Sequence, residues 1–226
     1  MCKDFSCIVT QSYQVAWKRG MSSHDQIYSA FVDSMPELKD HRSIKVEITP
    51  DEGYLQPEKG WTLKVDEPET PSWWSASHAK EAFKAHREWK AETYALINID
   101  EARNPINPLN IRKHKPTKSD IELLKTWDSV WASVWDSVGA LVGALVGASV
   151  WASVGALVGA SVWTSVGASV WAYTGSLFNI WGDTYKFQPA VDLWKRGFIP
   201  SFDGKTWRLH SGKKAEIVYE WTPNEK

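Results

Sequence analysis

Residues 128–179 read DSVW ASVW DSVG ALVG ALVG ASVW ASVG ALVG ASVW TSVG ASVW AYTG SLFN, which is thirteen tetrapeptides in one unbroken register. The third position is Val in eleven successive tetrapeptides, from Val130 to Val170. Self-similarity at a fixed period is typical of stacked, quasi-one-dimensional architectures. This repeat therefore determines which fold the sequence predicts for the middle of the chain.

The four-residue period favours strand over helix. An α-helix turns about 100° per residue, so each tetrapeptide overshoots a full turn by roughly 40° and the Val column drifts around the helix. A strand repeats every two residues, so four residues return a side chain to the same face. Val also prefers strands to helices. Spacing and propensity together predict short strands.

The composition of the four positions predicts which face is inside. Positions one and three are mostly Ala and Val, whereas position two alternates between Ser and Leu and position four between Trp and Gly. A close-packed interior does not tolerate Trp and Gly at equivalent depth. We therefore expect Ala and Val inside a short three-sided β-helix (β-solenoid) of twelve-residue coils, with the variable residues outside.

The outward side chains of this solenoid are the expected binding residues. They are Trp127, Trp131, Trp135, Trp151, Trp163, Trp171, Leu141, Leu145 and Leu157. Exposed apolar patches of this extent usually mark an interface with another subunit or protein. A row of Trp side chains can also stack on sugar rings or bases, so a glycan or a nucleotide is a possible small ligand.

The same stretch permits a membrane alternative. No charged residue lies between Val138 and Gly182, which is longer than the roughly 20 residues that a bilayer-spanning helix needs. Gly139, Gly143 and Gly147 form overlapping GxxxG spacings, which favour helix packing in membranes. However, Trp occurs throughout the stretch rather than in two interfacial belts. A soluble solenoid is favoured, and a glycine-rich membrane hairpin remains the alternative.

Composition limits the class of partner and the compartment. The chain has 226 residues and a formal net charge of −1, so bulk electrostatics give no case for nucleic acid as a partner. The opening MCKDFSC has no apolar signal region, which predicts a cytoplasmic protein. With two cysteines, Cys2 and Cys7, a disulfide scaffold is not expected.

The regions on either side of the repeat predict an α+β protein with four segments. We expect a small α+β domain at 1–70, a helical segment and linker at 71–126, the solenoid at 127–179 and a helix-plus-hairpin cap at 180–226. Alternation and turn signals predict strands at 5–10, 14–18, 43–49, 61–65 and 215–221, with a turn at 203–204. Helices are expected from 22 or 23 to 34, and at 75–97, 119–126 and 189–196. The lead-in helix and the C-terminal segment are expected to cap the solenoid ends.

Residues 1–9 read MCKDFSCIV, residues 15–27 read VAWKRGMSSHDQI, and residues 191–220 read VDLWKRGFIPSFDGKTWRLHSGKKAEIVYE. These segments resemble a group of uncharacterised proteins from bacteriophages and metagenomes, in which similar ends flank arrays of units such as ASVW and DSVG. The similarity covers most of the chain. It implies a phage origin, and a host cytoplasm as the compartment, but it supplies no functional residues.

Candidate chemistry outside the repeat is weak. After removal of the initiator Met, Cys2 would be an N-terminal nucleophile whose own amine acts as base, but the first domain looks too short for such a hydrolase. Cys2, Cys7 and His24 lack a fourth ligand and a recognised metal spacing. We therefore expect no enzyme, no metal site and no cofactor.

These observations predict a non-enzymatic interaction or assembly protein that uses the Trp/Gly and Ser faces of a β-solenoid. Its expected partner is a second copy of the chain or a host protein. A phage counter-defence protein that sequesters a host protein or a signalling nucleotide is the second hypothesis, and it rests on the resemblance alone. A membrane-active glycine-rich hairpin is the third.

Overall fold

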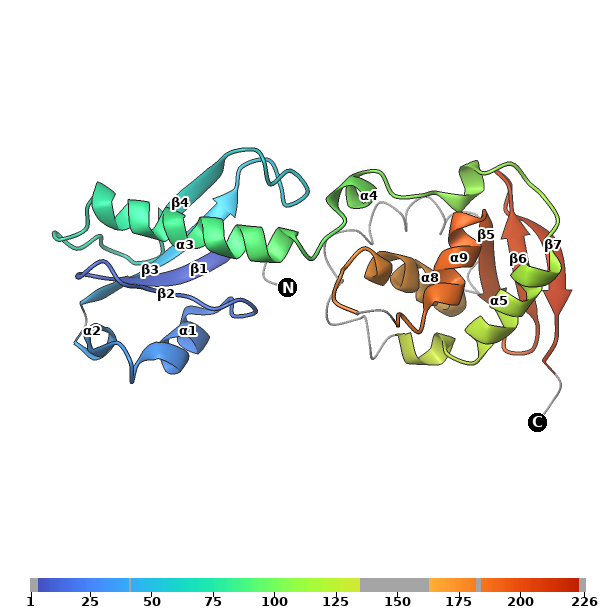
Figure 1. The fold of residues 1–226 in the computed structure, drawn as a ribbon, viewed down its shortest axis with the longest axis horizontal. Coiled ribbons are helices and arrows are strands. Elements are labelled where there is room, and N and C mark those ends of the chain that lie inside the picture. Colours follow the sequence, from blue (N-terminus) through green and yellow to red (C-terminus); the bar gives the residue numbers. More distant parts are fainter. Residues whose placement is uncertain (1–3, 41, 135–162, 182–183, 224–226) are drawn as a thin grey trace. The chain divides into compact units, whose positions relative to one another are not determined.

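The chain folds into two compact units, each of which has its own sheet. The structure, a computed structural model, describes residues 4–40, 42–134, 163–181 and 184–223 (Figure 1). The N-terminal unit comprises Met1–Leu96 and the C-terminal unit comprises Ile97–Lys226.

The N-terminal unit is built on a four-stranded antiparallel sheet with strand order β2-β1-β3-β4. Its strands are β1 (Phe5–Thr10), β2 (Val15–Ala16), β3 (Ser43–Pro50) and β4 (Trp61–Val65). Along β3, buried residues alternate with half-buried ones, so successive side chains point to opposite faces of the sheet. Figure 1 shows α3 on one side of this sheet and α1 and α2 on the other.

One face of this sheet is covered by α3 (Ala76–Tyr94). Phe5, Cys7 and Val46 of the strands pack there against Ala82 and Trp89 of the helix. Half-buried aromatic residues surround this core: Trp17, Trp61, Trp73, Trp74, Phe83 and Tyr94. Burial raises the pKa of the Cys7 thiol far above its usual range, since no part of the residue is exposed.

The opposite face is covered only in part. Helix α1 (His24–Phe31) and helix α2 (Pro36–Lys39) bury Ile27 and Leu38 against Ile8 of β1 and Ala16 of β2. The Ser23 hydroxyl accepts a hydrogen bond from the backbone N–H of Gln26 and thereby caps α1. On the β3 part of this face the side chains are polar and half-buried, and a groove opens there.

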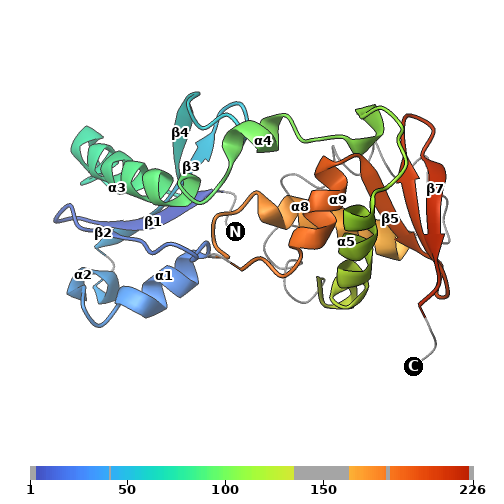
Figure 2. The same cartoon turned by 45° about the vertical axis from the view of Figure 1, so that its right-hand side comes forward.

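The C-terminal unit places helices against a three-stranded antiparallel sheet with strand order β5-β6-β7. Its described elements are α4 (Ile99–Arg103), η1 (Pro108–Asn110), α5 (Lys118–Asp128), η2 (Trp131–Ser133), α8 (Trp163–Ser176), α9 (Gln188–Lys195), β5 (Phe198–Phe202), β6 (Trp207–Ser211) and β7 (Glu216–Trp221). Figure 2 shows α5, α8 and α9 gathered beside β5. Trp127, Tyr173, Trp194 and Trp207 are fully buried in this core.

The prediction of a central β-solenoid, or β-helix, is wrong. The strands that the structure describes form two small open antiparallel sheets, and none of these strands comes from the repeat. Where the repeat is described, residues 128–134 end α5 and form η2, and residues 163–176 form α8. Residues 135–162 of the repeat lie outside the described part of the chain.

Helix α8 can form because most of its described residues are buried, so that it needs no single apolar face. It contacts α9, β5 and η2, and its residues 165–170 are all buried. The buried hydroxyl of Ser165 bonds to the backbone of Phe202 in β5, and those of Ser169 and Thr174 bond to backbone carbonyls one helical turn back. Ser169 donates to Val166 at 2.8 Å, and Thr174 donates to Val170 at 2.8 Å. A four-residue period is therefore compatible with this helix, although it rotates the Val positions around the axis.

The elements expected outside the repeat are confirmed. Strand β1 spans Phe5–Thr10 and β4 spans Trp61–Val65, as the alternation predicts. Helix α3 confirms the helix expected at 75–97 and buries Ala82, His86 and Trp89. Among the residues described, every helix is too short or too polar to cross a membrane. The uncharged segment on which the membrane alternative depends lies largely outside those residues.

Candidate functional site

The structure does not place the predicted binding residues on one exposed face. Trp127 is fully buried in α5, and Trp131 is half-buried beside Phe202 and Trp207, with ring centroids 5.9 and 5.8 Å away. Trp171 is half-buried in α8. Trp163 begins α8, but the structure does not describe its side chain. The other predicted residues lie outside the described part of the chain: Trp135, Leu141, Leu145, Trp151 and Leu157.

Trp127, which precedes the repeat, thus lies in the core of the C-terminal unit, whereas Trp131 and Trp171 of the repeat are half-buried. Trp207, a neighbour of Trp131, donates its indole N–H to the carboxylate of Asp128 at 2.7 Å. This bond ties the first residue of the repeat to β6. The solenoid faces that were expected to drive self-association do not exist in these residues.

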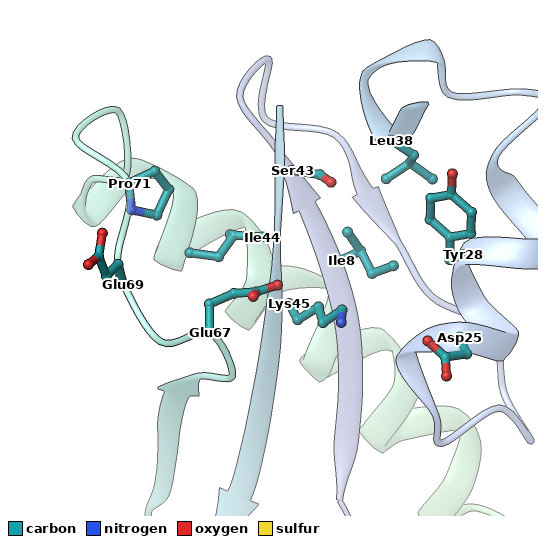
Figure 3. A pocket seen from close by; sticks show the side chains of 10 residues that line it. All are labelled: Ile8, Asp25, Tyr28, Leu38, Ser43, Ile44, Lys45, Glu67, Glu69 and Pro71. Carbon is teal, nitrogen blue, oxygen red and sulfur yellow. The ribbon is translucent and has the colours of Figure 1, made fainter. Parts of the chain in front are cut away.

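The N-terminal unit carries a groove of about 580 Å³ on the partly covered face of its sheet. We call it the acidic groove; its lining residues are Ile8, Asp25, Tyr28, Leu38, Ser43, Ile44, Lys45, Glu67, Glu69 and Pro71. Figure 3 shows Asp25 and Tyr28 of α1 on one side, and Glu67, Glu69 and Pro71 of the segment after β4 on the other. Residues of β1 and β3 lie between these walls.

Negative charge predominates in the acidic groove. Asp25, Glu67 and Glu69 contribute three carboxylates, and Lys45 contributes the one cation among the lining residues. Ile8 and Leu38 are almost completely buried and provide an apolar floor. An apolar floor between carboxylates suits a ligand that combines an aliphatic stem with a positively charged end, as Lys and Arg side chains do.

Three more ionisable side chains converge next to the acidic groove. His24 precedes Asp25 at the start of α1, Glu47 lies two residues after Lys45 on β3, and Asp66 directly follows β4. One ligand atom of each residue lies within 4.8 Å of the others. The Nδ1 atom of His24 is 3.3 Å from Oδ2 of Asp66, and its Nε2 atom is 3.3 Å from the carbonyl oxygen of Val46.

The C-terminal unit carries a second, basic groove of about 430 Å³. Its lining residues are Asn110, Ile111, Arg112, Lys113, Gly212, Lys213, Lys214 and Glu216. Lys113 forms an ion pair with Glu216, whereas Arg112, Lys213 and Lys214 have no carboxylate within 4.0 Å among the described residues. Concentrating like charges is unfavourable without a counter-ion, so this arrangement favours an anionic ligand.

Close backbone packing brings the basic residues 112–113 next to the basic residues 213–214. Gly212 has φ +74° at the turn between β6 and β7, and a Cβ atom there would lie 2.7 Å from Cβ of Lys113. Glycine is therefore needed at this position both for the backbone conformation and for the approach of Lys113. The turn is closed by a hydrogen bond of 2.8 Å from the N–H of Ala215 to the carbonyl of Gly212.

Ser201 and His210 form a serine–histidine pair that resembles a hydrolase dyad but lies in the core. The Ser201 hydroxyl is 2.7 Å from Nε2 of His210, and Nδ1 of His210 is 2.9 Å from the carbonyl of Ala215. Ser201 is 0% exposed, and neither residue lines the acidic or the basic groove. A nucleophile needs access to its substrate, so this pair serves to cross-link β5, β6 and the following turn.

The metal set of Cys2, Cys7 and His24 that the sequence made conceivable is not assembled. Cys7 points to the α3 face of the sheet, within the apolar core. His24 lies on α1, which packs on the opposite face. Cys2 lies outside the described residues. A sheet therefore separates Cys7 from His24.

Sequence reasoning missed both grooves, although part of the signal was visible. The alternation of β3 places Ser43, Lys45 and Glu47 on one face, and the acidic run 66–69 directly follows the next strand. In the C-terminal half, the basic runs 112–115 and 213–214 are evident in the sequence. Long-range packing, which the pattern does not encode, brings these segments together.

Comparisons with known proteins identify no relative whose function could explain the two grooves. No family model, no curated protein and no solved structure matches the chain. The functional argument therefore depends on the residues of the two grooves.

Proposed function

We propose that this protein is a binding protein whose N-terminal unit takes up a basic segment of a partner protein in the acidic groove. One observation supports this proposal above the others: Asp25 faces Glu67 and Glu69 across an apolar floor. The aliphatic stem of a Lys or Arg side chain would pack on Ile8 and Leu38, and its charged end would reach a carboxylate on either wall.

Lys45 adds a second requirement to the partner. As the one cation among the lining residues, it favours a ligand that also offers a carbonyl or carboxylate acceptor close to the basic side chain. A peptide segment meets both requirements, because its backbone carbonyls accept hydrogen bonds while its side chains provide the charge. The resemblance to phage proteins makes a host protein the first partner to test.

A titration with model peptides tests this proposal. We expect an amidated oligo-arginine peptide to shift the NMR signals of groove residues and to bind more weakly as salt is added, because exposed ion pairs are screened. An oligo-glutamate peptide of the same length should produce no such shifts. Replacing Glu67 and Glu69 together by Gln should weaken binding about tenfold, since each exposed pair contributes up to about 1 kcal/mol.

A matched variant separates the groove from general acidity. Glu81 and Glu88 lie on α3, which covers the opposite face of the sheet. Replacing both by Gln removes the same charge and should leave peptide affinity almost unchanged. The proposal would be refuted if the two double variants lost the same peptide affinity. It would also be refuted if the peptide shifted only NMR signals of residues outside the groove.

The basic groove supports a second function, which is capture of a phosphorylated small molecule such as a signalling nucleotide. Arg112, Lys213 and Lys214 provide cations that form no ion pair within 4.0 Å among the described residues, although Glu216 lies close enough to Lys214 to interact with it electrostatically, and Asn110 adds an amide. A thermal-shift series with nucleotides is the test. We expect stabilisation that disappears when Lys213 and Lys214 are replaced by Gln and persists when Lys205, which lies outside the groove, is replaced by Gln. Absence of stabilisation by any nucleotide would dismiss this function.

A further inference from the structure

We propose that His24, Glu47 and Asp66 bind a divalent transition-metal ion of the zinc class through Nδ1 and two carboxylate oxygens. This site is separate from the binding function of the acidic groove. It goes beyond that function because it uses residues that do not line the groove. Nitrogen and carboxylate oxygen are ligands that Zn²⁺ uses in proteins.

The hydrogen-bonding pattern of His24 leads to this inference. The Nε2 atom faces the carbonyl oxygen of Val46, which can only accept, so Nε2 must carry the hydrogen. In a neutral ring, Nδ1 then directs a lone pair at Oδ2 of Asp66, only 3.3 Å away. Two electron-rich atoms at this distance require either a proton between them, carried by the ring or by the carboxyl group, or a cation.

A bound cation accounts for the full set of contacts. Metal-binding histidines usually donate their other ring N–H to a carbonyl or carboxylate, which fixes the tautomer and the orientation of the ring. The carbonyl of Val46 supplies that acceptor here. The ring is also held rigidly, because His24 is the first residue of α1 and is 8% exposed.

The spacing of the ligand atoms also fits a small divalent ion. In a tetrahedral zinc site with bonds of about 2.0–2.2 Å, neighbouring ligand atoms lie about 3.4 Å apart. The separation of 3.3 Å between His24 and Asp66 agrees with this value, and the carboxylate of Glu47 lies within 4.8 Å. Two carboxylates and a neutral imidazole would balance the charge of a divalent ion.

Three separate elements hold the ligands in place before any ion binds. Glu47 lies on β3, where it is paired with Ser6 of β1 on one side and with Lys64 of β4 on the other. Asp66 is fixed by a hydrogen bond of 2.9 Å from its N–H to the carbonyl of Lys45. The side chain of Asp66 is 49% exposed, so an ion and a water ligand have access from solvent.

Calorimetric titration of the metal-stripped full chain with ZnCl₂ is the first test. We expect one equivalent to bind at this site and His24→Gln or Asp66→Asn to weaken its affinity by at least about tenfold, as loss of a ligand requires. His114→Gln removes an exposed histidine of the C-terminal unit, and Asp25→Asn removes a neighbouring carboxylate that is not a ligand. Both control variants should bind Zn²⁺ with the affinity of the original chain.

A spectroscopic readout reports on the metal ligands themselves. Co²⁺ bound by one nitrogen and two oxygens should give visible absorption bands that Zn²⁺ displaces and that His24→Gln abolishes, with far-UV circular dichroism confirming that the variant is folded. The proposal would be overturned if no Zn²⁺ bound, or if binding persisted unchanged in folded His24→Gln. An equal loss in Asp25→Asn would also overturn it, since the groove would then be attracting cations only by its overall charge.

Discussion

His86 shows at the scale of one residue how burial sets chemistry in the N-terminal unit. The ring lies in the aromatic core between Trp61 and Trp89, with centroids 4.4 and 5.7 Å away, and its Nε2 atom has no hydrogen-bond partner among the described residues. Burial, reinforced by Lys90 and Arg87, lowers the pKa of His86 from 6.5 to about 4. The folded unit therefore holds this histidine neutral.

This pKa predicts a specific dependence of stability on pH. Below pH 6.5 the unfolded chain binds a proton at His86 that the folded chain does not bind until the pH nears 4. The contribution to stability is thus complete above pH 6.5 and is lost as the pH falls towards 4. As the pH falls from 6.5 to 4, we expect protonation linked to His86 to lower the free energy of unfolding by about 2 kcal/mol, once solvent screening is allowed for.

The variant His86→Phe tests whether His86 causes this dependence of stability on pH. The variant removes an unpaired polar atom from the core, so at pH 7 we expect it to be as stable as the original chain or slightly more stable. Urea unfolding at pH 7, 5.5 and 4.5 should show the original chain losing more stability than the variant. Parallel curves for the two proteins would show that His86 does not cause the pH dependence.

Gly197 illustrates two separate demands on a single residue. It ends α9 with φ +87°, and a Cβ atom there would lie 2.7 Å from Cγ2 of Ile111. Gly204 has a similar φ of +95°, but its Cβ position is open. We expect Gly204→Ala to cost about 1 kcal/mol from backbone strain alone and Gly197→Ala about 3 kcal/mol, because the steric clash is added. Chemical denaturation of the two variants measures the difference.

Helix α8 shows at the scale of an element why the repeat misled the prediction. The period argument is valid for a long helix that must keep one apolar face, but α8 has only 14 residues and is covered by α9, β5 and η2. Serine, which suggested a solvent-exposed column, is buried at Ser169 because its hydroxyl bonds to the carbonyl of Val166. Tertiary packing therefore overrides both the period and the β-propensity of Val.

A substitution within α8 distinguishes the two interpretations of the repeat. The fourth position of the tetrapeptide holds either Trp or Gly, so a solenoid would accept Gly167→Trp on its outer face. In the structure Gly167 is buried, and a Trp side chain there would have to displace its neighbours. We expect the variant to lose several kcal/mol or to fail to fold. If the Gly167→Trp variant were as thermally stable as the original chain, this face of α8 would have to be open to solvent.

The flanking elements were predictable because each carries a local signal. Alternation marks β1 and β4, the Asp203-Gly204 pair marks the turn between β5 and β6, and Ser23 marks the start of α1. The grooves carry no such signal. The carboxylates of the acidic groove come from α1 and from the segment after β4, which are far apart in sequence, so only the folded sheet brings them together.

At the scale of the whole molecule, two units with separate cores predict two unfolding transitions. Trp89 packs in the core of the N-terminal unit and Trp194 in that of the C-terminal unit. We expect Trp89→Ala and Trp194→Ala each to destabilise one unit by about 3–5 kcal/mol. In differential scanning calorimetry, each variant should shift one transition and leave the other in place. A single transition that both variants shift together would show that the units unfold cooperatively.

The buried thiol of Cys7 can report how often the N-terminal unit opens. A thiol that is fully enclosed between β1 and α3, and whose pKa is raised by that enclosure, cannot meet an alkylating reagent until the helix leaves the sheet. With Cys2 replaced by Ser, each modified molecule would therefore record one opening event. When alkylation is faster than reclosing, the rate of modification, followed by mass spectrometry, would then measure how often this unit opens under native conditions without denaturant.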